Sequence, residues 1–198
     1  MNQNNSIEDT LTMPETEASE SVTNKVNWKL DPVHSEISFK VKHMMITNVR
    51  GILKDYTVKV VTEDEEFTNA KIRFTGETSS ITTGNDQRDT HLRSADFFDV
   101  VQNPEITFVS TSYSQMSTGI YKLQGNLCVK GVTKAVSLDV QFGGIQKDPW
   151  GKVKAGFSVN GKINRKDFGL NWNTILEAGG TMVSDDVYIM CEIQLVKS

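Results

Sequence analysis

The residues best suited to chemistry lie in one short polar segment, residues 84–97. If this segment is helical, Arg88 and His91 are three residues apart and lie on the same side of the helix. Asp89 and Arg93 are four residues apart, which is the spacing of a surface ion pair. An arginine fork suits phosphate or another polar head group. The spacing therefore predicts a head-group site at Arg88 and His91, with Arg93 beside them; a merely solvated helix surface is the alternative.

The histidines and cysteines indicate neither a metal site nor a nucleophile. His34 and His43 are nine residues apart around a predicted strand, which places them on opposite faces. His43 shares the parity of the apolar residues on that strand, so we expect it to point inward. It is the candidate acid or base if the protein is an enzyme. Cys128 and Cys191 have no histidine at a suggestive spacing. We therefore predict no metal, no catalytic residue and no cofactor other than a bound lipid.

Charge and composition exclude several classes of protein. The 198-residue chain has 21 basic and 25 acidic residues and a formal charge of −4, which disfavours a nucleic-acid-binding protein. No apolar run approaches the roughly 18 residues that cross a membrane, so the sequence predicts a soluble protein without an integral membrane segment. Two cysteines are too few for a disulfide scaffold.

The acidic excess lies in residues 1–26, which contain five acidic side chains, one lysine and no aromatic residue. Such a segment cannot bury enough apolar surface to offset the entropy of ordering it. We therefore predict a disordered tail at 1–26 and one barrel domain at 27–198. The tail has neither the positive start nor the apolar run of a secretory signal. It predicts a cytoplasmic protein, with export to the periplasm as the alternative.

A period of two dominates the sequence after the tail. Apolar and polar residues alternate most clearly in 37–41, 132–142, 153–163 and 183–195. This pattern is typical of strands with one buried and one solvated face. Weaker alternation predicts four more strands, at 51–62, 69–81, 105–115 and 119–130. Because several joints are short and turn-like, we predict an all-β fold in which eight antiparallel strands close into a barrel.

Two segments interrupt the alternation. Residues 84–97, between the third and fourth predicted strands, begin with Asn85 or Asp86 as a candidate N-cap and predict a short helix. Residues 166–181, before the last strand, predict a loop with one helical turn. Both segments lie between strands, so both are placed to cap or line a mouth of the barrel.

The interior of such a barrel is the natural place for a ligand. Eight strands enclose either a filled core or a cavity for one small ligand, and the inward parity here is apolar. We therefore predict an elongated hydrophobic cavity, with a filled core as the alternative. The strand and loop residues expected to line it are Ile37, Phe39, Val41, His43, Phe74, Phe108, Leu123, Phe142, Phe157, Phe168 and Trp172.

Five motifs in order resemble the YceI-like family. They are W-x-L-D-x-x-H-S-x-I-x-F-x-V-x-H-M at 28–44, R-D-x-H-L-R-x-x-D-F-F-D-V at 88–100, P-x-I-T-F at 104–108, G-N-L with K-G-V-T-K at 125–134, and N-R-K-D-F-G-L at 164–170. The resemblance covers about 170 residues. It implies a lipocalin-like extended barrel whose lumen binds a polyisoprenoid or a related amphiphile, such as a quinone-like or fatty-amide molecule. No catalytic reaction is established for that family, and many of its members are exported behind a signal peptide.

These observations favour a non-enzymatic carrier, storage or scavenging protein for a long apolar lipid. Two alternatives stay open. One is a lipid isomerase or cyclase that uses His43. The other is a stress-response or interaction module with a filled core, in which the acidic tail recruits a partner. The sequence shows no interface, and it leaves a homodimer open.

Overall fold

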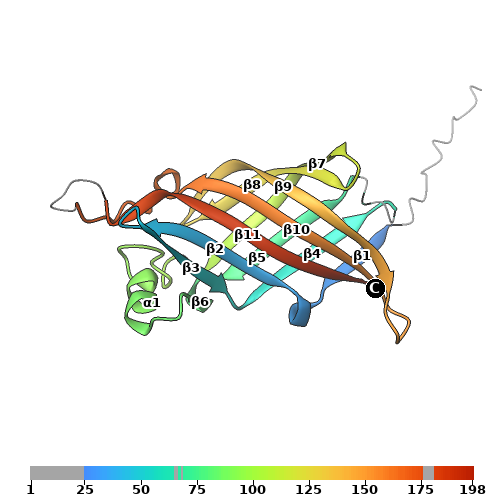
Figure 1. The fold of residues 1–198 in the computed structure, drawn as a ribbon, viewed down its shortest axis with the longest axis horizontal. Coiled ribbons are helices and arrows are strands. Elements are labelled where there is room, and N and C mark those ends of the chain that lie inside the picture. The colour runs from blue at the N-terminus through green and yellow to red at the C-terminus, as the bar shows by residue number, and fades with distance from the viewer. Residues whose placement is uncertain (1–24, 65–66, 68, 176–180) are drawn as a thin grey trace, which may run out of the picture.

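The computed structural model describes residues 25–64, 67, 69–175 and 181–198. It is an antiparallel β-barrel with one short α-helix (Figure 1). The strands are β1 (Val26–Leu30), β2 (Glu36–His43), β3 (Thr47–Leu53), β4 (Tyr56–Thr62), β5 (Lys71–Glu77), β6 (Ile81–Thr82), β7 (Glu105–Ser117), β8 (Ile120–Val129), β9 (Val132–Lys147), β10 (Val153–Asn164) and β11 (Val183–Lys197). The helices are α1 (Asp86–Arg93) and the 3-10 turns η1 (Pro32–His34), η2 (Thr78–Ser80) and η3 (Arg165–Phe168).

Eight of these strands form the closed ring β1-β4-β5-β7-β8-β9-β10-β11, because β1 pairs with both β4 and β11. The remaining strands extend the wall: β2 pairs with β11, β3 with β2, and β6 with β3. The predicted eight-stranded antiparallel barrel is therefore confirmed. Two predicted strands are broken, since 51–62 divides into β3 and β4, and 69–81 divides into β5, η2 and β6. Of the predicted tail, Lys25 and Val26 are described, and Val26 begins β1; the rest lies outside the described residues.

Alternation explains why the long strands form. Along β8 every second residue from Tyr121 is buried, and the register places Tyr121 opposite Val140 and Leu123 opposite Leu138. Cross-strand neighbours of this kind share a face of the sheet and pack on each other. The wall therefore turns one continuous apolar face toward the inside of the barrel.

A charged cluster holds the break between β1 and β2. The Asp31 carboxylate accepts hydrogen bonds from Lys154 Nζ at 2.9 Å and Gln194 Nε2 at 2.8 Å, and it lies 3.1 Å from His34 Nδ1. The hydrogen bond from Lys154 is the largest influence and, against the effect of burial, lowers the pKa of Asp31 well below its usual range. The cluster ties η1 to β10 and β11, so the chain can change direction without opening the barrel.

One end of the barrel is filled with side chains. Trp28, Val60, Phe67 and other apolar residues form a buried cluster beside β1, at the end where Figure 1 places the C-terminus. The Trp28 ring lies 4.8 Å from the Phe67 ring, and its Nε1–H donates to Thr62 Oγ1 at 3.2 Å. We call this cluster, with the aromatic rings packed on it, the plug.

Phe142 and Phe157 belong to the plug, so their predicted place in the cavity lining is wrong. Their rings lie 5.7 and 4.8 Å from the Phe67 ring and 5.1 Å from each other. Both side chains do point inward, as their parity predicts. They lie at the filled end because parity determines the face of a strand and not the position along the barrel axis.

The segments that interrupt the strands lie at the opposite end of the barrel. Helix α1 falls within the predicted 84–97 segment, and Asn85 caps it by accepting a hydrogen bond from Arg88 N at 2.9 Å. The predicted loop at 166–181 begins inside η3, and its residues 176–180 lie outside the described residues. Neither α1 nor any other helix in the described part of the chain is long and apolar enough to span a membrane.

Replacing Trp28 tests the plug. Trp28 is 2% exposed, so Trp28→Ala should lower the free energy of unfolding by about 3–5 kcal/mol through lost burial and a new cavity. Trp150 in the β9–β10 turn is 83% exposed, so Trp150→Ala should change it by less than about 0.5 kcal/mol. Urea unfolding followed by circular dichroism measures both, and equal effects of the two substitutions would contradict this account of the plug.

Candidate ligand-binding site

Beyond the plug the barrel is hollow. A cavity of about 610 Å³ runs from the plug to α1, which is within the usual 300–1,000 Å³ of small-molecule sites. Its wall is mostly apolar and comes from the inner faces of the strands together with α1 and the loop after η3. The filled-core alternative therefore applies to one end of the barrel only.

The structure brings most of the predicted lining residues together around this cavity. They are Ile37, Phe39, Val41, His43, Phe74, Arg88, His91, Phe108, Leu123, Phe168 and Trp172. The prediction missed the inward residues of β11, such as Val187 and Ile189, although their parity had marked them as inner. It also missed β3 and β4, where Val49 and Val58 line the cavity in strands whose alternation is weak.

Two glycines leave room for aromatic rings at the wall of the cavity. A Cβ atom on Gly51 would meet the Phe39 ring at 2.4 Å, and a Cβ atom on Gly125 would meet the Phe108 ring at 2.3 Å. Real Cβ atoms do not approach so closely, so only glycine leaves room for these rings. The glycines therefore widen the cavity, because larger residues would push Phe39 and Phe108 toward its centre.

A buried carboxylate fixes α1 at the mouth. Asp89 is 3% exposed and accepts hydrogen bonds from Thr82 Oγ1 at 2.7 Å and from Thr83 N at 2.8 Å, with a further bond from Thr83 Oγ1. Burial alone would raise the pKa of Asp89, but these hydrogen bonds, with a smaller effect of the Arg93 charge, outweigh burial and lower it. The predicted surface pair between Asp89 and Arg93 is therefore wrong, because Asp89 turns inward to the β6 segment.

Arg93 also differs from its predicted role. Its Nε donates to the Ser79 carbonyl oxygen at 2.9 Å, and its Nη2 donates to the Ile81 carbonyl oxygen at 3.1 Å. It does not line the cavity. Helical spacing placed Arg93 near the mouth, but the carbonyl groups around η2 and β6 hold its guanidinium, so it fastens α1 to the barrel.

Arg88 and His91 do lie together at the mouth. Arg88 is exposed; its Nε donates to Thr83 Oγ1 at 2.7 Å and its Nη2 donates to the Thr83 carbonyl oxygen at 3.0 Å. Within the described residues its Nη1 has no partner, so part of the fork is free for a ligand. The His91 ring packs edge-on against Trp172 at 4.7 Å, and its Nε2 lies 2.9 Å from Asp96 Oδ2.

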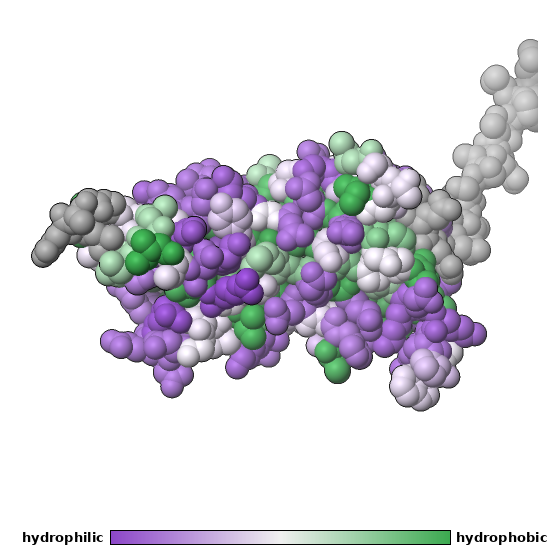
Figure 2. Space-filling view, viewed as in Figure 1, coloured by the Kyte–Doolittle hydropathy of each residue, from purple (hydrophilic) through white to green (hydrophobic). Residues whose placement is uncertain are grey.

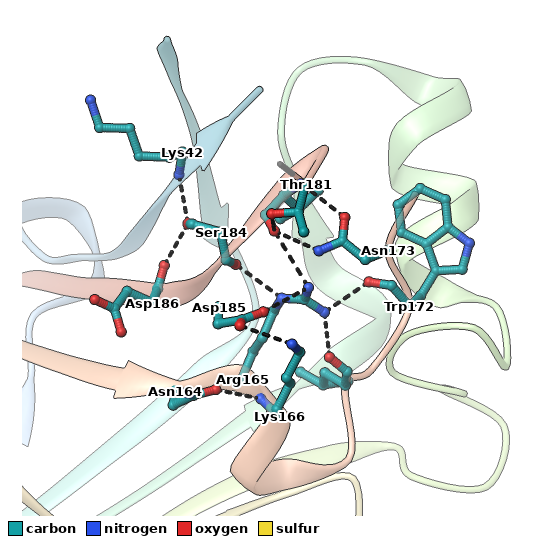
Figure 3. A network of polar contacts seen from close by, with 12 residues as sticks. Lys42, Asn164, Arg165, Lys166, Trp172, Asn173, Thr181, Ser184, Asp185 and Asp186 are labelled. Carbon is teal, nitrogen blue, oxygen red and sulfur yellow. Dashed lines mark hydrogen bonds and ion pairs between the residues drawn. The ribbon is translucent and has the colours of Figure 1, made fainter. Parts of the chain in front are cut away.

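Arg165 holds the other side of the mouth (Figure 3), a role that its place in the N-R-K-D-F-G-L motif alone does not predict. It is 3% exposed, and its guanidinium donates to the carbonyl oxygens of Ser184 at 3.0 Å and Trp172 at 2.8 Å. It also bonds the Leu170 carbonyl oxygen and, at 3.3 Å, Asp185 Oδ1. Burial lowers the pKa of Arg165 and outweighs the opposing effect of Asp185. These bonds fix Trp172 beside the cavity.

The remaining titratable side chains of the cavity offer little for catalysis. Cys191 faces the cavity, and burial raises the pKa of its thiol to about 12, so the thiol stays protonated at neutral pH. His43 also lines the cavity, as predicted, without a hydrogen-bond partner for its ring in the described residues. Across those residues no group of three or more His, Cys, Asp or Glu side chains is placed to hold a metal ion.

Comparison with known proteins identifies the family of this barrel. Residues 28–195 match the YceI-like domain. The chain belongs to the YceI-like family. A UPF0312 protein of Staphylococcus epidermidis is 39% identical over 161 residues, which are 81% of this chain and 91% of that protein. A UPF0312 protein of Staphylococcus aureus is 39% identical over 162 residues, covering 81% and 92%.

Solved structures also relate this chain to the YceI-like family. The YCEI protein of Campylobacter jejuni is 35% identical, superposes with a TM-score of 0.69, and covers 85% of this chain and 96% of that one. Two more distant structures share the fold. They are Burkholderia cenocepacia BcnA (TM-score 0.72, 22% identity, 83% and 98% covered) and a polyisoprenoid binding domain from Saccharophagus degradans (TM-score 0.58, 15% identity, 86% and 98% covered).

The hydrogen bonds of Asp89 predict a pH-dependent stability. Because its folded-state pKa is lowered, Asp89 stabilises the fold above the ordinary carboxyl pKa of about 4, and this contribution is lost as pH falls through the folded value. Asp89→Asn should lower the free energy of unfolding by about 1–3 kcal/mol near pH 7. The difference between the variant and the wild type should shrink in acid.

Urea unfolding of both proteins near pH 7 and in acid measures this difference. Asp86→Asn, on the exposed first turn of the same helix, is the control and should cost less than about 1 kcal/mol. A disadvantage of Asp89→Asn that persists undiminished in acid would contradict the account.

Proposed function

We propose that this YceI-like protein binds one long apolar lipid, a polyisoprenoid or a related amphiphile, in the lumen of the barrel and releases it chemically unchanged. The observation that carries the proposal is the apolar cavity of about 610 Å³, which the plug limits at one end and polar residues border at the other. The Saccharophagus degradans domain of the same fold, described as polyisoprenoid binding, supports this ligand class. Such a protein acts as a carrier, a store or a scavenger and needs no cofactor.

The shape of the cavity determines how affinity depends on the ligand. Each CH₂ group buried against the wall contributes about 0.8 kcal/mol before the cost of ordering the chain. Affinity should therefore rise with chain length until the chain reaches the plug at Phe67 and Phe157. A head group has to stay at the other end, because the deep part of the cavity offers it few polar partners.

The mouth provides those partners. The free part of the Arg88 fork, together with Asn85 and Gln87, borders the cavity beside α1. A guanidinium binds anionic oxygens more tightly than neutral ones, because charge-assisted hydrogen bonds are about twice as strong. We therefore assign an anionic or strongly polar head group to this side of the mouth.

Catalysis is the weaker reading of the same cavity. A general base acts when a second group orients it and a proton lies within its reach. The His43 ring has no such partner in the described residues, and the one paired imidazole of the lining, His91 with Asp96, lies at the solvent side of the mouth. Recovery of an incubated lipid without chemical change would support binding alone.

Filling the lumen tests the proposal. Val136 lines the cavity, whereas its neighbour Ser137 is exposed on the outer face of β9. Val136→Trp should weaken geranylgeraniol binding by about tenfold or more, because the indole takes the space of the chain; Ser137→Trp should leave it unchanged. For the wild type, affinity should rise about tenfold or more from geraniol to farnesol. Tryptophan-quenching titration measures these affinities. Equal geranylgeraniol affinities for the wild type, Val136→Trp and Ser137→Trp would contradict lumen binding.

The head-group assignment is tested separately. Arg88→Ala should weaken farnesyl diphosphate binding by about tenfold or more through loss of charge-assisted hydrogen bonds, while farnesol binding changes little. Arg73→Ala removes an exposed arginine from the outer face of β5 and should affect neither ligand. If Arg88→Ala binds the diphosphate as tightly as the wild type, the head group lies elsewhere.

A further inference from the structure

The turn between β2 and β3 presents three apolar side chains to solvent beside the mouth of the cavity. Met44, Met45 and Ile46 are 42%, 56% and 74% exposed. Figure 2 shows hydrophobic surface at the left end of the barrel, where Figure 1 places this turn. The preceding residue, His43, lines the cavity, and Met44 N donates to the Met182 carbonyl oxygen at 2.7 Å. The exposed turn is therefore part of the rim of the cavity.

A fourth apolar side chain lies on the neighbouring part of the rim. Ile175 is 83% exposed, and it forms a β-bridge with Thr181, next to Met182. Met182 itself lines the cavity and joins the two segments, since its carbonyl oxygen accepts from Met44 and its N–H donates to Thr174. We call Met44, Met45, Ile46 and Ile175 the apolar rim.

The backbone of the turn shows that the fold alone does not explain these residues. Met44 and Met45 have φ angles of 50° and 61°, in the left-handed region that bulky side chains rarely adopt. Asparagine or glycine would form this turn with less strain. The two methionines are also exposed, so packing does not repay the strain. A role at the surface accounts for both the left-handed backbone and the exposure of these methionines.

Positive charge lies directly behind the rim. Lys40 and Arg50 are paired opposite each other on the outer face of β2 and β3, with Lys42 beside them, although like charges in such positions repel. In the described residues, the Lys42 ammonium and the Arg50 guanidinium make no hydrogen bond or ion pair. The bond of Lys42 to Ser184 in Figure 3 comes from its backbone nitrogen and leaves the ammonium group free. Lys40 lies over the Tyr188 ring at 5.0 Å.

The two acidic residues of β11 nearest the rim, Asp185 and Asp186, already have basic partners. Asp185 is bound by Arg165 and, at 2.9 Å, by Lys166, and Asp186 is bound by Lys162 at 3.0 Å. Their charges are thus already compensated. We call Lys40, Lys42 and Arg50 the basic patch.

We propose that the apolar rim and the basic patch dock the barrel on an anionic lipid bilayer, with the mouth of the cavity facing the membrane. Apolar tips that enter the acyl boundary, with basic side chains at the level of the head groups, are the pattern of interfacial membrane binding. This inference rests on the proposed lipid binding and adds that the lipid comes from a bilayer. A chain can then pass between bilayer and lumen without crossing water.

A second copy of the chain fits this surface less well. An isologous contact through the rim would bring two basic patches toward each other, and like charges across an interface disfavour association. An anionic bilayer meets both the apolar and the basic part of the surface. Charge complementarity therefore favours the membrane.

Vesicle flotation with the full-length protein tests the docking surface. The protein should bind vesicles of phosphatidylcholine mixed with phosphatidylglycerol about tenfold better than vesicles of phosphatidylcholine alone, and added salt should weaken this binding. Ile46→Asp and Arg50→Glu should each reduce the anionic binding by about tenfold. The matched control is Val33→Asp, which alters a side chain that is 83% exposed in η1, away from the mouth, and it should bind as the wild type does.

Farnesol titration without vesicles separates docking from lumen binding. If Ile46→Asp binds farnesol normally but no longer binds vesicles, docking is confirmed. If the wild type binds farnesol but no vesicles, or if Val33→Asp loses vesicle binding as Ile46→Asp does, docking by the rim is overturned while the proposed function stands. Vesicle binding without farnesol binding would leave docking intact and overturn the lumen proposal. A wild-type dimer that Ile46→Asp converts to a monomer in light scattering, without vesicle binding, would make the rim a contact between copies and overturn membrane docking.

Discussion

Closure of the barrel by the short strand β1 is the constraint on which the other features depend. Trp28 pairs with Val60 of β4 on one side and with Lys197 of β11 on the other, so five residues join the two ends of the sheet. Closure pairs both edges of the eight-stranded ring and turns its inward apolar side chains toward one interior. That interior has to be filled by side chains or by an apolar ligand, because an apolar lumen offers water too few hydrogen bonds.

The two ends of the barrel meet this constraint in different ways. At one end Trp28 and Phe67 bring the walls together through aromatic packing, and no ligand is needed. At the other end, Gly51 and Gly125 leave room for the Phe39 and Phe108 rings at the wall, while Asp89 and Arg165 use buried hydrogen bonds to hold the mouth in place. The result is a cavity that is deep, apolar and closed at its far end. A long chain with a polar head group has the matching shape.

Much of this arrangement could be predicted from the sequence, because strand parity is a local property. Alternation identified the barrel and most of the residues that line the cavity. It failed for Phe142 and Phe157, since parity does not tell which end of the barrel a residue occupies. Helical spacing failed for Asp89 and Arg93, because their partners are contributed by η2 and the β6 segment, which spacing within a helix does not include. The volume of the cavity depends on closure and on packing across the barrel, which no single segment encodes.

Native mass spectrometry of the purified protein, followed by solvent extraction and identification of what is released, measures lipid binding in the lumen most directly. We expect an adduct with the mass of one lipid per chain, which solvent releases as an unchanged prenyl-chain or related amphiphilic compound, and which Val136→Trp lacks. A mass of the protein alone, unchanged after incubation with prenols, prenyl diphosphates and quinones, would contradict lipid binding in the lumen.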